Sequence, residues 1–203
     1  MLDPKIAAAK SIPEAVAAAA LVFGDAPALV YKTAPGDPYS GRFTFRQLAQ
    51  LPRAIGTALI EQFGLKPDQK IGFISENRYE YNLGDLATMS GGGVSWGLYD
   101  YDVKDPEIIE YKLCDSETEI VVTAPTFLES MRAIVRGGKT PLKKLIVMDM
   151  PHDSIRFQQN ETPFSDILKN GKENPGLIDA RLGGVNRDNV ARLIYTSGTT
   201  GRP

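Results

Sequence analysis

Nine residues at the end of the sequence bring together groups that could bind phosphate: Tyr195-Thr196-Ser197-Gly198-Thr199-Thr200-Gly201-Arg202-Pro203. Phosphate oxygens accept hydrogen bonds from hydroxyl and backbone N–H groups, and glycine lets the backbone approach an anion closely. The segment is not a Walker loop, because Gly198 and Gly201 lack the four-residue gap and the Gly-Lys-Ser/Thr ending. Taken alone, it is also typical of an ordinary Ser/Thr/Gly turn. Its place in the fold must therefore decide between the two interpretations.

The segments that would position this loop alternate between strands and helices. Short apolar runs predict strands at Ala28–Tyr31, Ile71–Ile74, Val94–Leu98, Glu119–Thr123, Leu145–Met148 and Arg192–Tyr195. Periodicity and capping residues predict helices at Ala15–Phe23, from Thr44 (with Gln47 in capping-box position), at Arg78–Ser90, from Asp105 and at Pro125–Val135. The polar stretch from Pro151 to Asn189 is predicted to be mostly loop, with a short helix near Phe164–Lys169.

Continuous apolar strands separated by helices predict an α/β fold, a layered parallel sheet with helices on both faces. Ligands of such sheets bind beyond the carboxyl ends of the strands. The loop after Tyr195 would project from that edge, which favours a binding role over a plain turn.

The composition excludes several classes of function. The 23 basic and 25 acidic residues are well mixed and give a net charge of -2, so nothing predicts binding to nucleic acid or selective attraction to anionic lipid. One cysteine, Cys114, rules out an internal disulfide framework and fits a reducing compartment. One histidine, His152, rules out a metal cluster with several histidine ligands, and its polar, proline-flanked segment favours a solvated loop. No metal-ligating residues are predicted.

The alanine-rich segment Ala15–Phe23 raises the question of a secretory signal. Glu14 stands at its start and no basic region precedes it, so an amphipathic helix ending at Gly24 is the better interpretation. No segment approaches the ~20 apolar residues that span a bilayer. We therefore expect a cytoplasmic protein without a transmembrane segment, and leave peripheral membrane contact open.

Four further features invite a functional interpretation but fit a structural one better. Cys114 is expected to be a small core residue rather than a nucleophile, and Trp96 a core residue rather than the wall of an acyl pocket. Asp100, Asp102 and Asp105 alternate like a metal loop, but they lack the glycine and distal glutamate of an EF-hand and are expected to form a solvated turn with a helix cap. Gly91-Gly92-Gly93 is expected to end a helix.

The segment Tyr195–Pro203 resembles, at every specified position, the phosphate-loop signature Tyr-Thr-Ser-Gly-Thr-Thr-Gly-x-Pro of the adenylate-forming superfamily, the AMP-dependent synthetases and ligases. The resemblance covers nearly the whole chain, including Asp25–Leu29, Phe43–Leu48, Lys70–Arg78, Gly92–Tyr99 and Tyr111–Glu117. The long-chain acyl-CoA synthetase branch fits best. Trp96-Gly97 departs from the usual Val-Pro, which bears on the subfamily rather than the superfamily.

This resemblance implies a two-step reaction. A fatty acid carboxylate attacks the α-phosphate of ATP to give an acyl-adenylate and pyrophosphate, and coenzyme A then displaces AMP, with Mg²⁺ on the phosphates. The loop residues would bind ATP, with Thr196, Ser197, Thr199 and Thr200 as hydroxyl donors and Gly198 and Gly201 as backbone positions. None of them would be a catalytic proton-transfer group.

The resemblance also implies that residues 1–203 are the N-terminal part of an AMP-binding domain, incomplete and ending within the phosphate loop, with the family's C-terminal domain absent. We therefore expect the chain to be inactive alone. The alternative is a non-catalytic module derived from that family that binds a nucleotide or a partner. A Rossmann oxidoreductase is disfavoured, because no Gly-x-Gly-x-x-Gly follows any predicted strand.

Overall fold

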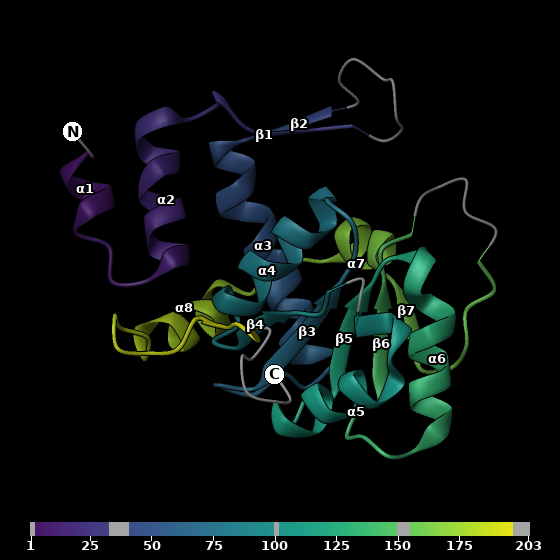
Figure 1. The fold of residues 1–203 in the computed structure, drawn as a ribbon. Helices are drawn as coiled ribbons and strands as arrows, with labels where there is room; N and C mark the ends of the chain where they lie inside the picture. The colour runs from purple at the N-terminus through teal and green to yellow at the C-terminus, as the bar shows by residue number, and fades with distance from the viewer. Residues whose placement is uncertain (1–2, 33–40, 100–101, 150–154, 197–203) are drawn as a thin grey trace. The chain divides into compact units, whose positions relative to one another are not determined.

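The computed structural model describes residues 3–32, 41–99, 102–149 and 155–196. The chain forms two compact units (Figure 1). Unit 1 comprises Met1–Pro67, Arg78–Gly92 and Gly171–Asn189, and unit 2 comprises Asp68–Asn77, Gly93–Asn170 and Val190–Pro203. Each unit is described by itself.

Unit 1 is mainly helical and carries one small hairpin. Its elements are α1 (Pro4–Ala7), α2 (Ile12–Phe23), β1 (Pro27–Tyr31), β2 (Gly41–Thr44), α3 (Phe45–Glu61), α4 (Tyr79–Ser90) and α8 (Pro175–Gly183). The predicted start of α3 is confirmed: the Thr44 hydroxyl accepts from the backbone N–H of Gln47 at 3.2 Å, and the Gln47 side chain accepts from the Thr44 N–H at 2.9 Å. The predicted end of α2 at Gly24 is also confirmed.

A close approach of α3 and α4 depends on Gly56. A Cβ added there would lie 2.9 Å from the backbone oxygen of Ala87, which is closer than real Cβ contacts. Helix α3 continues through Pro52. The predicted helix end at Gly91–Gly93 is confirmed, with Gly91 as the C-cap of α4 and Gly92 at a positive φ of 77°.

The prediction that Pro151–Asn189 is mostly loop is wrong for α8. Asn174 caps this helix by accepting from the N–H of Leu177, and Pro175 begins it. Arg53 of α3 holds the helix through Glu173 and Asp179, each at 2.6 Å. The cap and the proline were readable in the sequence, but the helix is short and weakly amphipathic, so tertiary contacts must stabilise it.

Unit 2 contains a six-stranded sheet in the order β7-β6-β5-β3-β4-β8, in which every neighbouring pair is parallel. The strands are β3 (Lys70–Ile74), β4 (Val94–Gly97), β5 (Ile120–Thr123), β6 (Lys144–Val147), β7 (Glu161–Pro163) and β8 (Arg192–Leu193). The helices are η1 (Asp102–Lys104), α5 (Pro106–Asp115), η2 (Pro125–Phe127), α6 (Leu128–Gly137) and α7 (Phe164–Asn170). The sequence did not predict strand β7, but it did predict the short helix near Phe164, which is α7.

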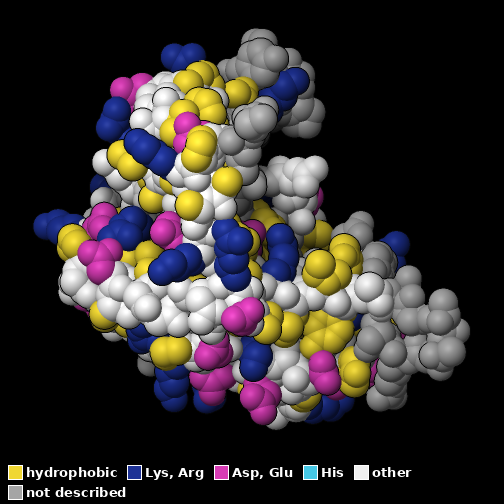
Figure 2. All heavy atoms as spheres, turned by 90° about the vertical axis from the view of Figure 1, so that its left-hand side faces the viewer, with side chains coloured by type: hydrophobic (Ala, Val, Ile, Leu, Met, Phe, Trp, Pro, Cys, Tyr) yellow, Lys and Arg dark blue, Asp and Glu magenta, His cyan; other side chains and the backbone are white. Residues whose placement is uncertain are grey.

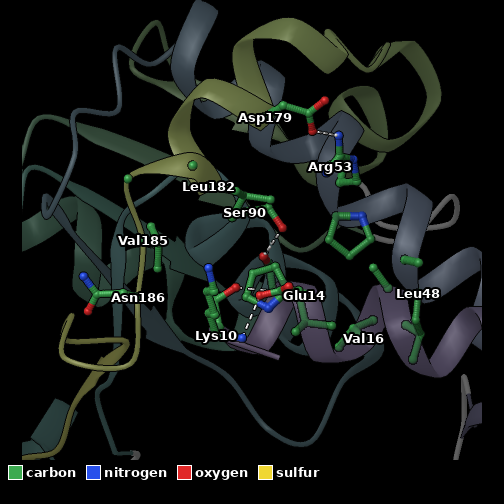
Figure 3. Close-up of a pocket in the computed structure, with 18 residues that line it drawn as sticks. Lys10, Glu14, Val16, Leu48, Arg53, Ser90, Asp179, Leu182, Val185 and Asn186 are labelled. Atoms are coloured by element: carbon green, nitrogen blue, oxygen red, sulfur yellow. Dashed lines mark hydrogen bonds and ion pairs between the residues drawn. The ribbon is translucent and has the colours of Figure 1, made fainter. Parts of the chain in front are cut away.

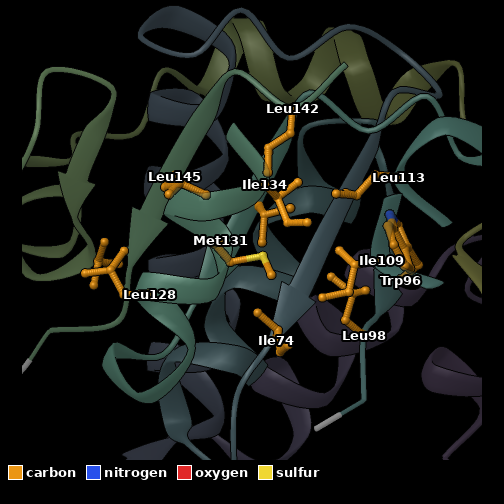
Figure 4. Close-up of a cluster of buried hydrophobic side chains, with 12 residues drawn as sticks. Ile74, Trp96, Leu98, Ile109, Leu113, Leu128, Met131, Ile134, Leu142 and Leu145 are labelled. Carbon is orange, nitrogen blue, oxygen red and sulfur yellow. The ribbon is translucent and has the colours of Figure 1, made fainter. Parts of the chain in front are cut away.

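The core of unit 2 lies where α5 and α6 pack on the sheet (Figure 4). It consists of Ile74, Trp96, Leu98, Ile109, Leu113, Val121, Leu128, Met131, Ile134, Leu142, Leu145 and Val147. Strand side chains alternate between faces, and the intervening residues Ile71, Phe73, Val122 and Ile146 are buried as well. Both faces of the sheet are therefore covered, and the predicted α/β fold with a parallel sheet flanked by helices is confirmed.

Candidate phosphate-binding site

Strand β8 ends at the carboxyl edge of the sheet, where the sequence predicts the phosphate loop. It pairs with β4 at two positions, Ser95 with Arg192 and Trp96 with Leu193, so it is shorter than the predicted Arg192–Tyr195. Thr196 follows it with an exposed side chain. The other predicted loop residues, Ser197, Gly198, Thr199, Thr200 and Gly201, lie outside the described residues.

Tyr195 ties the end of β8 to α5. Its hydroxyl donates a 2.6 Å hydrogen bond to Asp115 Oδ2, and its ring packs edge-on against Trp96 with 5.2 Å between centroids. Burial, and then the hydrogen bond to the Asp115 carboxylate, raises the pKa of Tyr195 well above its ordinary value. The phenol therefore stays neutral and keeps its donor role through the physiological pH range.

Trp96 is fully buried beneath Tyr195, which confirms its predicted place in the core. Its indole N–H donates to Thr118 Oγ1 at 2.7 Å, and the Thr118 hydroxyl lies 2.8 Å from that of Ser116. The Ser116 hydroxyl donates to the backbone oxygen of Lys112 at 2.6 Å. The polar groups under Tyr195 are thus linked to one another and to α5.

A buried ion pair lies in the same region. Lys112 of α5 and Asp102 of η1 are 1% and 0% exposed, and the Lys112 ammonium donates to both carboxylate oxygens of Asp102 at 2.8 and 2.9 Å. Asp102 Oδ2 also accepts from the backbone N–H of Tyr99 at 2.8 Å. The ammonium lies 5.7 Å from the ring centroid of Tyr99 and 5.5 Å from that of Tyr195.

This pair corrects the prediction that Asp102 belongs to a solvated turn. The aspartate is buried because a cation ten residues further along the chain reaches it from a helix. Asp105 is the N-cap of α5, as predicted, and accepts from the N–H of Glu107 at 3.0 Å. Asp100 and His152 lie outside the described residues.

The prediction that Cys114 is a core residue is wrong. Its thiol is exposed, and Sγ lies 3.4 Å from the backbone oxygen of Lys139. One residue of helix turns the side-chain direction by about 100°. Leu113 therefore faces the core while Cys114 faces outward.

The sequence alone gave no role to Lys112 or Asp115, although both lie in Tyr111–Glu117, one of the segments that resemble the adenylate-forming superfamily. Both face Tyr195, but no local pattern relates a residue of α5 to one about 80 positions later. The only available signal was that two ionisable residues stand near Leu113, on a helix expected to pack on a sheet.

The described end of β8 offers one of the groups predicted to bind phosphate. Thr196 is exposed and follows a strand at the carboxyl edge of the parallel sheet, and its hydroxyl is of a type that can donate to a phosphate oxygen. Within the described ranges, no group of three or more His, Cys, Asp or Glu could hold a metal ion.

Unit 1 contains a separate cavity of about 480 Å³ (Figure 3). It is lined by residues of α2, α3, α4 and α8, among them Glu14, Val16, Leu48, Arg53, Ser90 and Asp179. Arg53 forms an ion pair with Asp179 there, and the Glu14 carboxylate accepts a hydrogen bond from the backbone N–H of Lys10.

The surface of unit 1 carries exposed apolar side chains at the end of α2. Leu21 is 80% exposed and Phe23 is 47% exposed. In Figure 2, hydrophobic side chains lie over the upper part of the visible face among both basic and acidic side chains. No helix in the described ranges is both long enough and apolar enough to cross a membrane.

Comparison with known proteins places these features in a family. Residues 16–203 match the family model described as AMP-binding enzyme. Among curated proteins, the chain is 30% identical over 189 residues to a human mitochondrial malonate–CoA ligase, covering 91% of this chain and 28% of that protein. It is 30% identical over 166 residues to fatty acyl-CoA synthetase A of Dictyostelium discoideum, covering 79% of this chain and 23% of that protein. The chain thus spans about a quarter of the length of these relatives.

Solved structures show the same fold. The anthranilate–CoA ligase AuaEII, in complex with anthranoyl-AMP, matches with a TM-score of 0.74 and 20% identity, over 96% of this chain and 34% of that one. A long-chain-fatty-acid–CoA ligase from Archaeoglobus fulgidus matches with a TM-score of 0.71 and 19% identity, over 99% of this chain and 36% of that one. Because the family model covers most of the sequence and the fold agrees, the chain belongs to the family of AMP-binding enzymes.

Proposed function

We propose that this chain supplies part of the ATP phosphate site of an AMP-forming long-chain fatty acid–CoA ligase. The observation that carries the proposal is that β8 delivers Thr196, with an exposed side chain, to the carboxyl edge of a parallel sheet in a chain of the AMP-binding family. The coarser function, activation of a carboxylic acid by a ligase, agrees with the names of the relatives.

The role proposed for the loop is to bind and orient phosphate. The hydroxyls of Thr196, Ser197, Thr199 and Thr200 would donate to the β- and γ-phosphates, and Gly198 and Gly201 would let backbone N–H groups approach. Mg²⁺, when bound, would neutralise phosphate charge. Tyr195 holds the start of the loop, because its hydroxyl is bonded to Asp115 and its ring is packed on Trp96.

Binding of Mg·ATP to the purified chain tests the role of Thr196. Thr196→Val removes a hydroxyl donor at nearly constant volume and should weaken binding by about five- to tenfold, which corresponds to one lost hydrogen bond to a charged group. Thr196→Ser keeps the hydroxyl and should bind like the wild type. If the Val and Ser variants bind Mg·ATP with equal affinity, the Thr196 hydroxyl does not contribute to the phosphate site.

Activity tests the proposal at the level of the reaction. Because the chain spans only about a quarter of its curated relatives, we expect it to catalyse no ATP–pyrophosphate exchange with any fatty acid. Turnover by the chain, purified free of host synthetase, would contradict this expectation.

The acyl substrate requires a separate test, because the relatives include both a malonate and a fatty acyl enzyme. The gene should be sequenced beyond the codon for Pro203. If the frame continues, its product should support exchange with palmitate and not with malonate. The reverse preference would assign a short dicarboxylic acid as the substrate, and a stop codon after Pro203 would favour the alternative of a non-catalytic module.

A cytoplasmic location is also part of the proposal, and fractionation of the source cells would test it.

A further inference from the structure

We propose that the buried Lys112–Asp102 pair is a positioning device for Thr196, the first residue of the predicted phosphate loop, and that it acts through the ring of Tyr195. The proposal rests on the proposed function for its purpose. Its contacts are independent of that function and lie within the described residues of unit 2.

The backbone of β8 is poorly suited to fix the residues that follow it. Its ladder with β4 has only two positions, the last at Leu193, and Ile194 is 70% exposed. A strand of two residues leaves the next residues free to change direction unless side chains hold them. Tyr195 is the residue that supplies such contacts.

Three groups contact the Tyr195 side chain. Asp115 accepts from its hydroxyl, Trp96 packs against its ring, and the Lys112 ammonium lies 5.5 Å from its ring centroid. Lys112 has little freedom of its own, because both oxygens of Asp102 bind it. The ammonium is thus held in place and helps to orient the Tyr195 ring. Because Thr196 is the next residue in the chain, a fixed Tyr195 side chain restricts the backbone conformation at Thr196.

Stability alone is a weak reason for this arrangement. Burying two charges costs as much as their attraction returns, and well-packed apolar residues of similar volume are often as stable. What an apolar pair cannot reproduce is the attraction between a desolvated cation and the faces of two tyrosine rings. Asp102 adds a hydrogen bond to the backbone of Tyr99, so the same pair also fixes the chain after β4.

The test uses the full 203-residue chain, in which Trp96 is the only tryptophan and is fully buried. Loosening Tyr195 should let acrylamide reach the indole. In Lys112→Met/Asp102→Leu, we expect an unfolding midpoint within a few degrees of the wild type but a quenching constant raised about twofold or more. Wild-type quenching in a variant of wild-type stability would overturn the proposal.

A matched control is available at the other edge of the same sheet. Arg132, which is partly buried, and Glu161 of β7, which is buried, also form a two-point ion pair. Arg132→Met/Glu161→Leu should leave Trp96 quenching at its wild-type value. An equal rise in both double variants would show a general loosening and would overturn a specific role for Lys112.

If the Lys112/Asp102 double variant does not unfold cooperatively, Tyr195 variants decide the question with the ion pair intact. Tyr195→Phe keeps an aromatic face toward Lys112, and Tyr195→Leu does not. We expect quenching to be clearly lower in the Phe variant than in the Leu variant. Equal quenching would mean that the ring face does not matter, and would overturn the proposal.

Titration with Mg·ATP separates this proposal from the proposed function. If the wild type binds, the Lys112/Asp102 double variant should bind on the order of tenfold more weakly, the loss expected for a desolvated cation–π contact, and the Arg132/Glu161 control should bind normally. Unchanged affinity in the first variant would count against positioning of Thr196. If the wild type does not bind, the proposed function fails for this chain, and the quenching comparison still decides whether Lys112 positions Tyr195.

Discussion

The parallel sheet carries an ion pair near each of its two edges, and the two pairs differ in ways that separate structural roles from positioning roles. Arg132 of α6 binds Glu161 of β7 through two hydrogen bonds of 2.6 Å, and also donates to Glu129 and to the backbone oxygen of Arg156. Lys112 of α5 donates to both carboxylate oxygens of Asp102, and its ammonium also lies near the rings of Tyr99 and Tyr195.

The difference follows from the chemistry of the two cations. A guanidinium has five donors in a planar fork and can join several acceptors from different segments, so Arg132 fastens α6, β7 and the preceding loop together. An ammonium is a compact charge that a carboxylate can hold in place and that can also lie over aromatic faces. Arg132 therefore joins several segments at the β7 edge, and Lys112 places a cation near the rings of Tyr99 and Tyr195 at the β8 edge.

The largest expected effect is that of removing one charge from the pair at β8. Lys112→Met leaves the Asp102 carboxylate buried without its cation, and we expect the free energy of unfolding to fall by about 3–5 kcal/mol. Urea unfolding followed by Trp96 fluorescence measures it. In Lys112→Met/Asp102→Leu most of this loss should be recovered, and a double variant as unstable as the single one would contradict the account.

The pair at β7 should show a smaller effect and a pH dependence. Glu161→Gln weakens the contact to Arg132 and should cost about 1–2 kcal/mol at neutral pH. The hydrogen bond from Arg132 holds the pKa of Glu161 below its usual value near 4.5. Its contribution is therefore present above pH 4.5 and lost as the pH falls through the lower pKa of the folded state.

Urea unfolding at a series of acidic pH values tests this dependence. The stability difference between the wild type and Glu161→Gln should shrink as the pH falls below 4.5. A constant difference down to the acid transition would mean that the carboxylate charge of Glu161 contributes nothing.

The Tyr195 hydroxyl should contribute less, because Asp115 is exposed to solvent. We expect Tyr195→Phe to cost about 0.5–1 kcal/mol at neutral pH. The pKa of Tyr195 is raised in the folded state, so its contribution is complete below pH 10, the ordinary value, and declines as the pH rises further. The wild type should approach Tyr195→Phe in stability above pH 10, and a difference that widens there would contradict the sign of the shift.

The smallest effect is expected at Cys114, two residues from Lys112 on the same helix. Its exposed thiol should react with a thiol reagent in the folded protein, and Cys114→Ser should change stability by less than about 0.5 kcal/mol. Thiol labelling under native conditions and urea unfolding measure the two quantities. If the thiol of Cys114 reacts only in denaturant, the cysteine is buried in the folded protein, as the sequence had predicted.

Much of the fold was predictable because the signals for it are local. The apolar runs at β3, β5 and β6 and the capping box at Thr44 depend on neighbouring residues, and the structure has these elements where the sequence placed them. Helix α8 and strand β7 were missed, because each is short and is stabilised by contacts with distant segments.

The candidate site divides in the same way. The residue types of Thr196–Gly201 and the apolar strand before them are enough to predict, from the sequence alone, that a phosphate-binding loop follows a strand. Which side chains contact the end of that strand was decided only by the tertiary structure. Asp102, Lys112, Asp115 and Tyr195 come from a turn, a helix and a strand end, and they meet because the parallel order β3-β4-β8 sets α5 and the end of β8 beside each other. The burial of Asp102 is the plainest case, since a carboxylate stays charged inside a protein only when folding brings it a partner.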